Sequence, residues 1–267
     1  MRDIETWSWV LPDGTLVGLG NHEPPDDVVV RVSGQLPDIP KSEWREFDLR
    51  TDSTYKVKVK DQGQYGACNG HAAATSLEIA RYIAGMEHVD LSAWLVYADL
   101  CNGRDVGSNI SQALLHLESK GTCEDTLVKH GTINPRNIQQ AARDNAKRYK
   151  IEIGYRINNF NDMCIAAQLR MPFNYSVPVN GNFNTLDRNG VPGNRSGWHN
   201  HAVTGGLYMK KLSDGTWIVG SQNSWTERWG NRGYFSAAER TVEGRGFDAY
   251  SVTAVTVDPQ NLPPKVK

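Results

Sequence analysis

Three side chains in this sequence could together carry out nucleophilic catalysis by a cysteine. Cys68 follows a glycine-containing loop and opens a stretch with helical spacing, and the positive end of a helix favours thiolate over thiol. His201 begins an apolar segment, and Asn223 follows the next expected strand. Because an Asn carbonyl can fix the tautomer of a histidine that exchanges protons with cysteine, the three form a candidate catalytic set.

The surroundings of this set refine the expectation. Trp225, which follows Asn223 closely, is expected to shield the bond between His201 and Asn223 from water. A helix terminus and an imidazolium both lower the pKa of a thiol. We therefore expect Cys68 and His201 to rest as a thiolate–imidazolium pair. Taken alone, however, Cys68 fits a small buried apolar residue better.

The elements that must position these residues divide into a helical half and a strand half. Apolar residues at helical spacing predict helices, and alternating apolar residues between turn signals predict strands. The expected helices cover 68–84, 91–100, 109–119, 135–148 and 161–170, and the expected strands cover 151–157, 173–179, 202–208, 217–220, 233–235 and 250–257. This order predicts an α+β fold, with a helical lobe beside an antiparallel sheet.

The two ends of the chain are expected to lie outside this fold. Residues 1–43 form an extension, in which a Pro-Asp-Gly turn predicts a hairpin over 7–17 and a further strand is expected over 28–32. Residues 44–258 form the main domain, and the proline-rich residues 259–267 are expected to be disordered.

Composition limits which classes of partner and which cellular compartment we expect. With 29 Lys and Arg against 30 Asp and Glu, the net charge is −1, so no long-range field favours nucleic acid or an anionic membrane. No stretch resembles a secretory signal or approaches the roughly 18 apolar residues that span a bilayer. The four cysteines are too few and too scattered for a disulfide framework. We expect a reducing compartment such as the cytoplasm, or a place in a larger particle.

One run of residues is specific enough to indicate a family. Residues 222–234, Gln-Asn-Ser-Trp-Thr-Glu-Arg-Trp-Gly-Asn-Arg-Gly-Tyr, are similar to the Asn-Ser-Trp-Gly-x-x-Trp-Gly-x-x-Gly-Tyr pattern of papain-like cysteine peptidases. Cys68 within Tyr-Gly-Ala-Cys-Asn, followed far downstream by His201, has the family's order and spacing. The resemblance extends over about residues 45–257. It implies a papain-like fold of two lobes, a helical lobe and an antiparallel sheet or barrel lobe, with the active-site cleft between them.

The resemblance also assigns further site residues. Gln62, six residues before Cys68, matches the glutamine whose amide stabilises the oxyanion in the family. Gly107 and Ser108 resemble the family's glycine-containing cleft wall. The remaining residues expected at the substrate cleft are His199, Asn200, Ala202 and Trp225. The implied substrate is a polypeptide, and no metal or organic cofactor is required.

Three departures from the family pattern qualify this assignment. Asn69 stands where the family has an aromatic residue, which removes packing but no catalytic atom. Tyr65 replaces a cysteine that in many members pairs with one near Cys101, so the corresponding disulfide should be missing. The stretch before Trp44 is too short for the helical inhibitory propeptide of secreted members. We expect it to pack on the domain or contact a protein partner.

Alternative functions remain open at this point. Cys68, His71, His199 and His201 could bind zinc, although a catalytic cysteine must stay uncoordinated, and His71 is expected to face its own lobe. An acyl-enzyme could be resolved by an amine, giving an acyltransferase rather than a hydrolase. The chain could also be a structural or binding module that retains the fold. Hydrolysis of peptide bonds through a thioester acyl-enzyme is the favoured interpretation.

Overall fold

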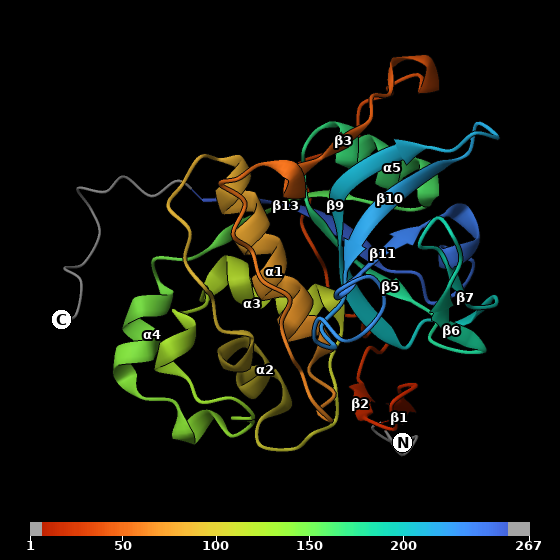
Figure 1. Cartoon of the computed structure of the whole chain (residues 1–267). Coiled ribbons are helices and arrows are strands. Elements are labelled where there is room, and N and C mark those ends of the chain that lie inside the picture. Colours follow the sequence, from red (N-terminus) through yellow and green to blue (C-terminus); the bar gives the residue numbers. More distant parts are fainter. Residues whose placement is uncertain (1–6, 256–267) are drawn as a thin grey trace.

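The computed structural model describes residues 7–255 (Figure 1). The α-helices are α1 (Cys68–Ile83), α2 (Ala93–Cys101), α3 (Ile110–Ser119), α4 (Gln140–Ala146) and α5 (Phe160–Gln168). The longer strands are β1 (Trp7–Val10), β2 (Leu16–Leu19), β4 (Ile151–Arg156), β5 (Phe173–Val177), β6 (Asn182–Leu186), β9 (His201–Lys211), β10 (Trp217–Gln222), β11 (Tyr234–Ala237) and β13 (Ala249–Ala254). The two-residue strands are β3 (Phe47–Asp48), β7 (Pro192–Gly193), β8 (Gly197–Trp198) and β12 (Gly244–Arg245).

A mainly antiparallel sheet forms one lobe. Its strands follow the order β11-β10-β9-β5-β13-β4, and β3 pairs with β9 outside this path. Buried residues run along most of β5 and β9, because α1 covers one side of these strands and α5 contacts β9 on the other. An aromatic core that includes Phe183, Trp225, Trp229 and Phe235 fills this lobe. The fold is therefore the predicted α+β arrangement.

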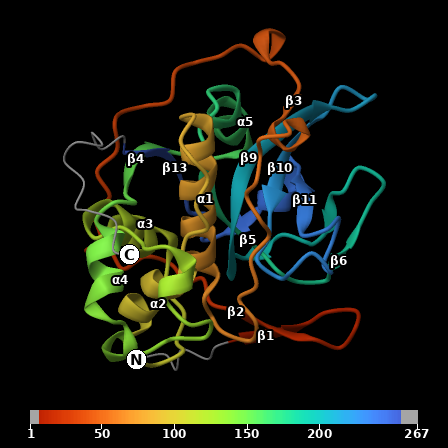
Figure 2. The same ribbon diagram turned by 60° about the vertical axis from the view of Figure 1, so that its left-hand side comes forward.

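Helix α1 stands between the helical lobe and the sheet (Figures 1 and 2). Its first thirteen residues are all buried. Small residues such as Ala72 and Ala73 allow close approach to β9, where the hydroxyl of Thr204 donates to the carbonyl of Ala72 at 2.9 Å. The N-terminus of α1 consequently meets the start of β9.

Most predicted elements are present, with three differences. The helix expected over 135–148 is reduced to a 3-10 turn at Pro135–Asn137 and the short α4. The strand expected over 28–32 is wrong, since these residues form no strand and the side chain of Val29 is 74% exposed. Strands β3, β6, β7, β8 and β12 were not predicted, because strands of two to five residues leave little pattern.

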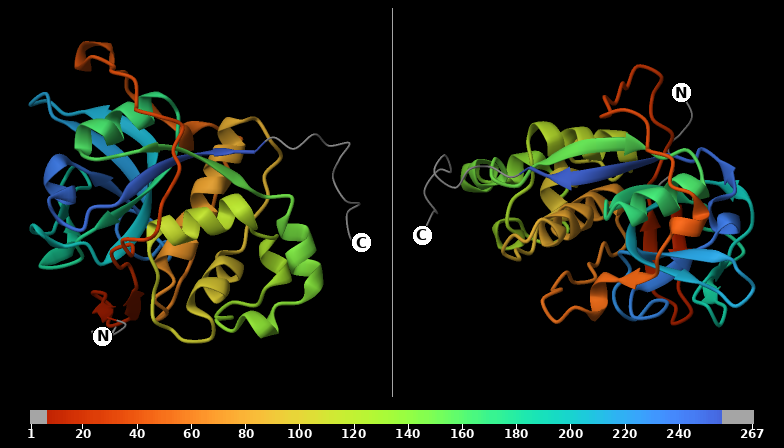
Figure 3. Two further views of the ribbon diagram at one scale, coloured as in Figure 1. Left: turned by 180° about the vertical axis from the view of Figure 1, so that it is seen from behind. Right: turned by 90° about the horizontal axis from the view of Figure 1, so that it is seen from above.

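The N-terminal extension, residues 7–43, wraps around the molecule. Strands β1 and β2 form the predicted hairpin, with Gly14 at φ 84° in its turn. The chain then passes between the lobes and runs up the back of the molecule (Figure 3), where the backbone N–H of Ser33 donates to the carbonyl of Gly154 in β4. It enters the sheet lobe at the buried Trp44. Residues 18–22, which cross between the lobes, are called the crossing segment below.

Two further expectations concern the ends and the membrane. The tail at 259–267 lies outside the described residues. Within residues 7–255, no helix is both long and apolar enough to cross a membrane.

Candidate active site

Cys68 lies where the two lobes meet. It is the first residue of α1 and is fully buried. Its sulfur accepts hydrogen bonds from the backbone N–H groups of Ala202, at the start of β9, and of Gly20 in the crossing segment. The sulfur therefore faces the strand that carries His201.

The sheet register brings His201 and Asn223 together. Strands β9 and β10 pair with Thr204 opposite Gln222, so Asn223 lies at the same end of the hairpin as His201. The Nε2 atom of His201 donates to Oδ1 of Asn223 at 2.8 Å, and the ring of Trp225 stacks on the imidazole at 4.5 Å between centroids. This is the arrangement that the sequence predicted.

The other nitrogen of His201 remains available. Within the described part of the chain, Nδ1 is buried and has no hydrogen-bond partner. Because the bond to Asn223 keeps the proton on Nε2, Nδ1 carries the lone pair in the neutral ring. His201 can therefore accept a proton at Nδ1.

Burial in this closed structure disfavours the charged forms of both reactive groups. Burial raises the pKa of the Cys68 thiol to about 11. Burial also lowers the pKa of His201 to about 4, although the bond to Asn223 acts in the opposite direction. The predicted thiolate–imidazolium pair is therefore not the state of the covered site, because low-dielectric surroundings disfavour both charges.

Gln62 points its amide at the crossing segment. Its Nε2 donates to the carbonyls of Gly18 at 2.9 Å and of Tyr65 at 2.8 Å. The hydroxyl of Ser224 donates to Oε1 of Gln62 at 2.6 Å, which fixes the amide with its N–H groups facing the segment. Ser224 was missed as a positioning residue, since only the folded chain brings it beside Gln62. The Gln62 amide that is expected to donate to the oxyanion is therefore already bonded to the carbonyl oxygen of Gly18.

The crossing segment fills the space between the lobes. On the helical side, Ser108 accepts from the N–H of His22 at 2.9 Å and donates its own N–H to Gly20 at 2.8 Å. On the sheet side, the N–H of Asn21 donates to the carbonyl of Asn200 at 3.1 Å. The extension packs on the domain, as expected, but its passage across the site itself was not predicted.

Two glycines allow this close fit. A Cβ added to Gly18 would lie 2.1 Å from the carbonyl oxygen of Tyr65, and one added to Gly20 would lie 2.1 Å from that of Gly66. Neither glycine has a positive φ, so space rather than backbone strain excludes a side chain. The Gly-x-Gly spacing was the one sequence signal that could have indicated this contact.

The remaining predicted residues border the crossing segment in different ways. Ser108 contacts the segment through its backbone, and the adjacent Gly107 has a φ of 73° that keeps its backbone close to Gly20. The carbonyls of His199 and Asn200 accept from the side chain and the backbone of Asn21. These two residues therefore meet the segment through main-chain groups.

Two polar residues behind the site have structural partners. Nδ1 of His199 bonds with Ser176 inside the sheet lobe. His71 bonds with the carbonyls of Ala67 and Asp61 in its own lobe, as expected. Over residues 7–255, no group of three or more His, Cys, Asp and Glu side chains is placed to hold a metal ion.

Asn69 replaces lost packing with hydrogen bonds. Its side-chain amide donates to the carbonyl of Ser108 at 2.9 Å and to that of Gly20 at 3.4 Å. It therefore joins the cleft wall to the crossing segment. All four cysteines are free.

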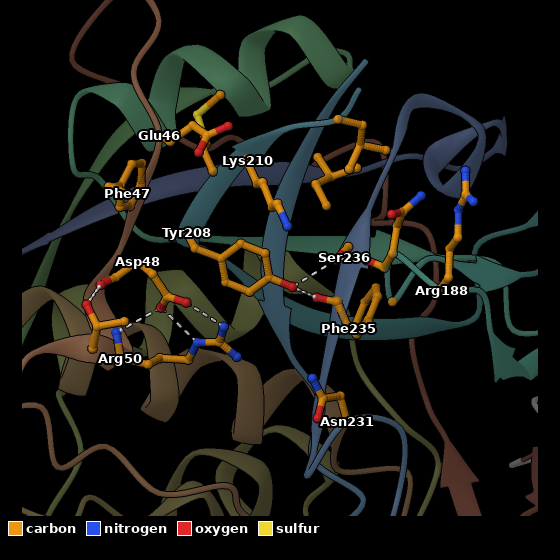
Figure 4. Close-up of a pocket in the computed structure, with 16 residues that line it drawn as sticks. Glu46, Phe47, Asp48, Arg50, Arg188, Tyr208, Lys210, Asn231, Phe235 and Ser236 are labelled. Atoms are coloured by element: carbon orange, nitrogen blue, oxygen red, sulfur yellow. Dashed lines mark hydrogen bonds and ion pairs between the residues drawn. The ribbon is translucent and has the colours of Figure 1, made fainter. Parts of the chain in front are cut away.

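A separate hollow lies away from these residues. It encloses about 580 Å³ between β3, the turn at 188–190 and strands β9–β11 (Figure 4). Tyr208 and Phe235 contribute to its lining, while Arg50 is held by Asp48 at its edge. None of the predicted site residues lines it.

Comparison with known proteins identifies the family. The family model described as papain family cysteine protease matches residues 44–255. The chain belongs to this family. Two curated plant relatives are similar to it: the thiol protease SEN102 of Hemerocallis sp., 26% identical over 209 residues, and the oryzain beta chain of rice, 26% identical over 215 residues. These alignments cover 70% and 74% of this chain but only 52% and 42% of the relatives, so the chain spans about half of their length.

Solved structures of family members share the fold. Xylellain, a cysteine protease from Xylella fastidiosa, aligns with a TM-score of 0.67 at 19% identity, covering 89% of this chain and 97% of its own. Bromelain protease from Ananas comosus, solved in complex with the E64 inhibitor, aligns with a TM-score of 0.60 at 25% identity, covering 80% and 99%. The papain-like fold extends over most of both molecules.

Proposed function

We propose that this chain is a cysteine peptidase that hydrolyses peptide bonds through Cys68, His201 and Asn223. The observation that carries the proposal is the hydrogen bond from His201 to Asn223. This bond leaves Nδ1 of His201 without a partner in the described part of the chain. The next residue of the same strand, Ala202, contacts the Cys68 sulfur through its backbone N–H. Membership of the papain family supports the same chemistry.

The proposed reaction begins with transfer of the Cys68 proton to Nδ1 of His201. The sulfur then bonds to the carbonyl carbon of the scissile peptide, and the resulting oxyanion accepts hydrogen bonds from Gln62 and the Cys68 N–H. His201 returns the proton to the leaving nitrogen as the C–N bond breaks, which leaves a thioester. Water, deprotonated by His201, attacks the thioester, releasing the carboxyl product and regenerating Cys68.

Burial explains why substrate binding must precede the chemistry. In the closed structure Cys68 is buried, Gln62 is bonded to Gly18, and burial disfavours both charged forms, so the crossing segment must move before a substrate can react. An incoming polypeptide would find the carbonyl of Asn200 and the backbone of Ser108 as hydrogen-bond partners. These groups recognise main chain, which suits a polypeptide substrate.

The test is turnover of a fluorogenic peptide library at high concentration. The wild-type protein should hydrolyse it, and Cys68→Ala should abolish hydrolysis while the unfolding temperature stays close to that of the wild type. Cys101→Ala, which removes a different buried thiol, should remain active. An epoxide inhibitor such as E64 should add its mass to the peptide that contains Cys68. Unchanged hydrolysis by Cys68→Ala would refute the proposal.

A further inference from the structure

The contact between the crossing segment and the nucleophile is not one that leads to cleavage. The group of this segment that meets the Cys68 sulfur is the N–H of Gly20, which donates a hydrogen bond to it. The carbonyl held by Gln62 belongs to Gly18, two residues earlier. Attack requires a carbonyl carbon at the sulfur with its own oxygen in the oxyanion site, and here those two positions are occupied by different residues.

The crossing segment is held mainly by backbone hydrogen bonds, which another polypeptide could form in its place. The N–H groups of Gly18, Asn21 and His22 donate to carbonyls of Gly63, Asn200 and Ser108. Each such bond contributes little net free energy, because water or another main chain can take its place. Leu19, at 4% exposure, adds apolar contacts with the core of the sheet lobe.

The segment is tethered on both sides of the crossing. On one side the hairpin β1–β2 buries Leu11 and Val17 against the sheet-lobe core. On the other side the chain is fixed beside β4 at Ser33 and then continues into β3, which pairs with β9. A segment tied in this way has an effective concentration in the millimolar range at the site, so it closes again whenever the site is empty.

We propose that the crossing segment, residues 18–22, is a reversible gate that a polypeptide substrate displaces while the segment stays covalently attached and uncut. This inference rests on the proposed peptidase function. The gate bonds to the backbone groups that a substrate would need, covers Cys68, and accepts a hydrogen bond from Gln62. Opening it exposes both catalytic groups in one movement, and closing it returns the thiol to a buried, neutral state.

A tethered competitor has a distinct kinetic signature. The apparent affinity for substrate falls by the fraction of molecules that are open, whereas the rate at saturating substrate is unaffected. Opening the gate by mutation should therefore lower KM and leave kcat unchanged. Activation by excision would behave differently, because the uncut chain would then have no kcat of its own.

The experiment uses Gly20→Ala, because the added methyl group would meet the carbonyl oxygen of Gly66. Leu19→Ala loosens the same segment by removing buried contacts instead of adding bulk. Val29→Ala is the matched control, since Val29 lies on the same extension and is 74% exposed. All three positions lie outside the family domain at 44–255, so folding of that domain should be retained.

Two readouts are measured on each protein. The first is the rate at which iodoacetamide alkylates Cys68, mapped by mass spectrometry, which requires no peptidase activity. The second is peptide hydrolysis, accompanied by the intact mass of the chain, 29.7 kDa when uncut. We expect Gly20→Ala and Leu19→Ala to be alkylated at least about tenfold faster than the wild type. KM should fall by a similar factor at equal kcat, in chains that keep their full mass, while Val29→Ala matches the wild type.

The outcomes separate the two proposals. Hydrolysis that appears only together with N-terminally shortened chains would overturn the gate and leave the peptidase standing. The gate also fails if the wild type is alkylated as fast as Gly20→Ala. Fast alkylation of both opened variants without hydrolysis of any peptide would instead refute the peptidase, and with it a gate opened by substrate, and would leave the segment only as a cover over Cys68.

Discussion

The orientation of one amide group connects the proposed catalytic residues to each other. Gln62 can donate toward the substrate only if its oxygen is turned away, and the hydroxyl of Ser224 holds that oxygen at 2.6 Å. Ser224 in turn follows Asn223, whose Oδ1 accepts from both His201 and the Ser224 N–H. The orienter of the histidine and the orienter of the oxyanion donor are thus neighbours in the chain.

Replacement of Gln62 tests the oxyanion assignment. In a Gly20→Ala background, Gln62→Ala should lower kcat by roughly 10²–10³-fold, because a donor aimed at the developing charge is lost. The opened background is needed since Gln62 also holds Gly18 in the closed protein. Steady-state kinetics with a peptide substrate provide the measurement, and Gln64→Ala, at an exposed position in the same loop, is the control. A change confined to KM would contradict the role.

The helices are joined to each other by a buried carboxylate. Asp99 of α2 accepts from His116 of α3 at 3.0 Å and from Arg143 of α4 at 2.9 Å, with its side chain only 7% exposed. Burial by itself would raise the pKa of Asp99, but the hydrogen bonds and charges of His116 and Arg143 outweigh it and hold the pKa well below its usual value. This contact stabilises a lobe whose α4 is short.

Asp99→Asn should therefore destabilise the protein by about 2–3 kcal/mol at pH 7. Because the folded-state pKa is depressed, the stabilisation is fully present above the unfolded value of about 3.9 and is lost as pH falls below it. The difference in urea unfolding between variant and wild type should consequently shrink below about pH 4. Asp144→Asn, which removes an exposed pair with Lys147, should leave the stability almost unchanged, because solvent screens such pairs. An equal deficit at every pH would contradict this account.

The extension ties the lobes of the whole molecule together. It contacts the sheet lobe through its hairpin, crosses the site, follows the edge of β4 and rejoins the sheet at β3. Its outer side is weakly covered, since Val10, Leu16, Val29 and Val32 are exposed. A segment with few apolar contacts and replaceable hydrogen bonds is expected to open more readily than the core.

Hydrogen exchange can measure this difference. The amides of Gly18, Asn21 and His22 should exchange at least about 10²-fold faster than those of the buried pairing between β5 and β9, because local opening is less costly than global unfolding. Gly20→Ala should speed exchange in the crossing segment and leave the β5–β9 amides unchanged. Equal protection of segment and core would mean that the extension opens only when the whole protein unfolds.

The sequence indicated the proposed chemistry and most of the elements, because the patterns that specify them lie within short stretches. Helix spacing after Cys68, strand alternation around His201 and the run from Gln222 to Tyr234 each lie within a short stretch. The α+β fold was therefore predictable from residue order, and the proposal of Cys68, His201 and Asn223 as the catalytic set rests on the same kind of signal. The false strand at 28–32 arose for the same reason. An apolar run indicates a strand, but pairing depends on a partner edge that no local pattern specifies.

Tertiary contacts determined the state of the site. The expected ion pair required a solvated thiol, whereas the folded chain buries Cys68 under Gly20, and desolvation outweighs the helix terminus. Ser224 and Gly18 both bond to the side chain of Gln62 only because the fold brings distant segments together. Covalent order specifies which groups are present, but burial and the approach of non-local backbone determine which of them are charged, occupied or free.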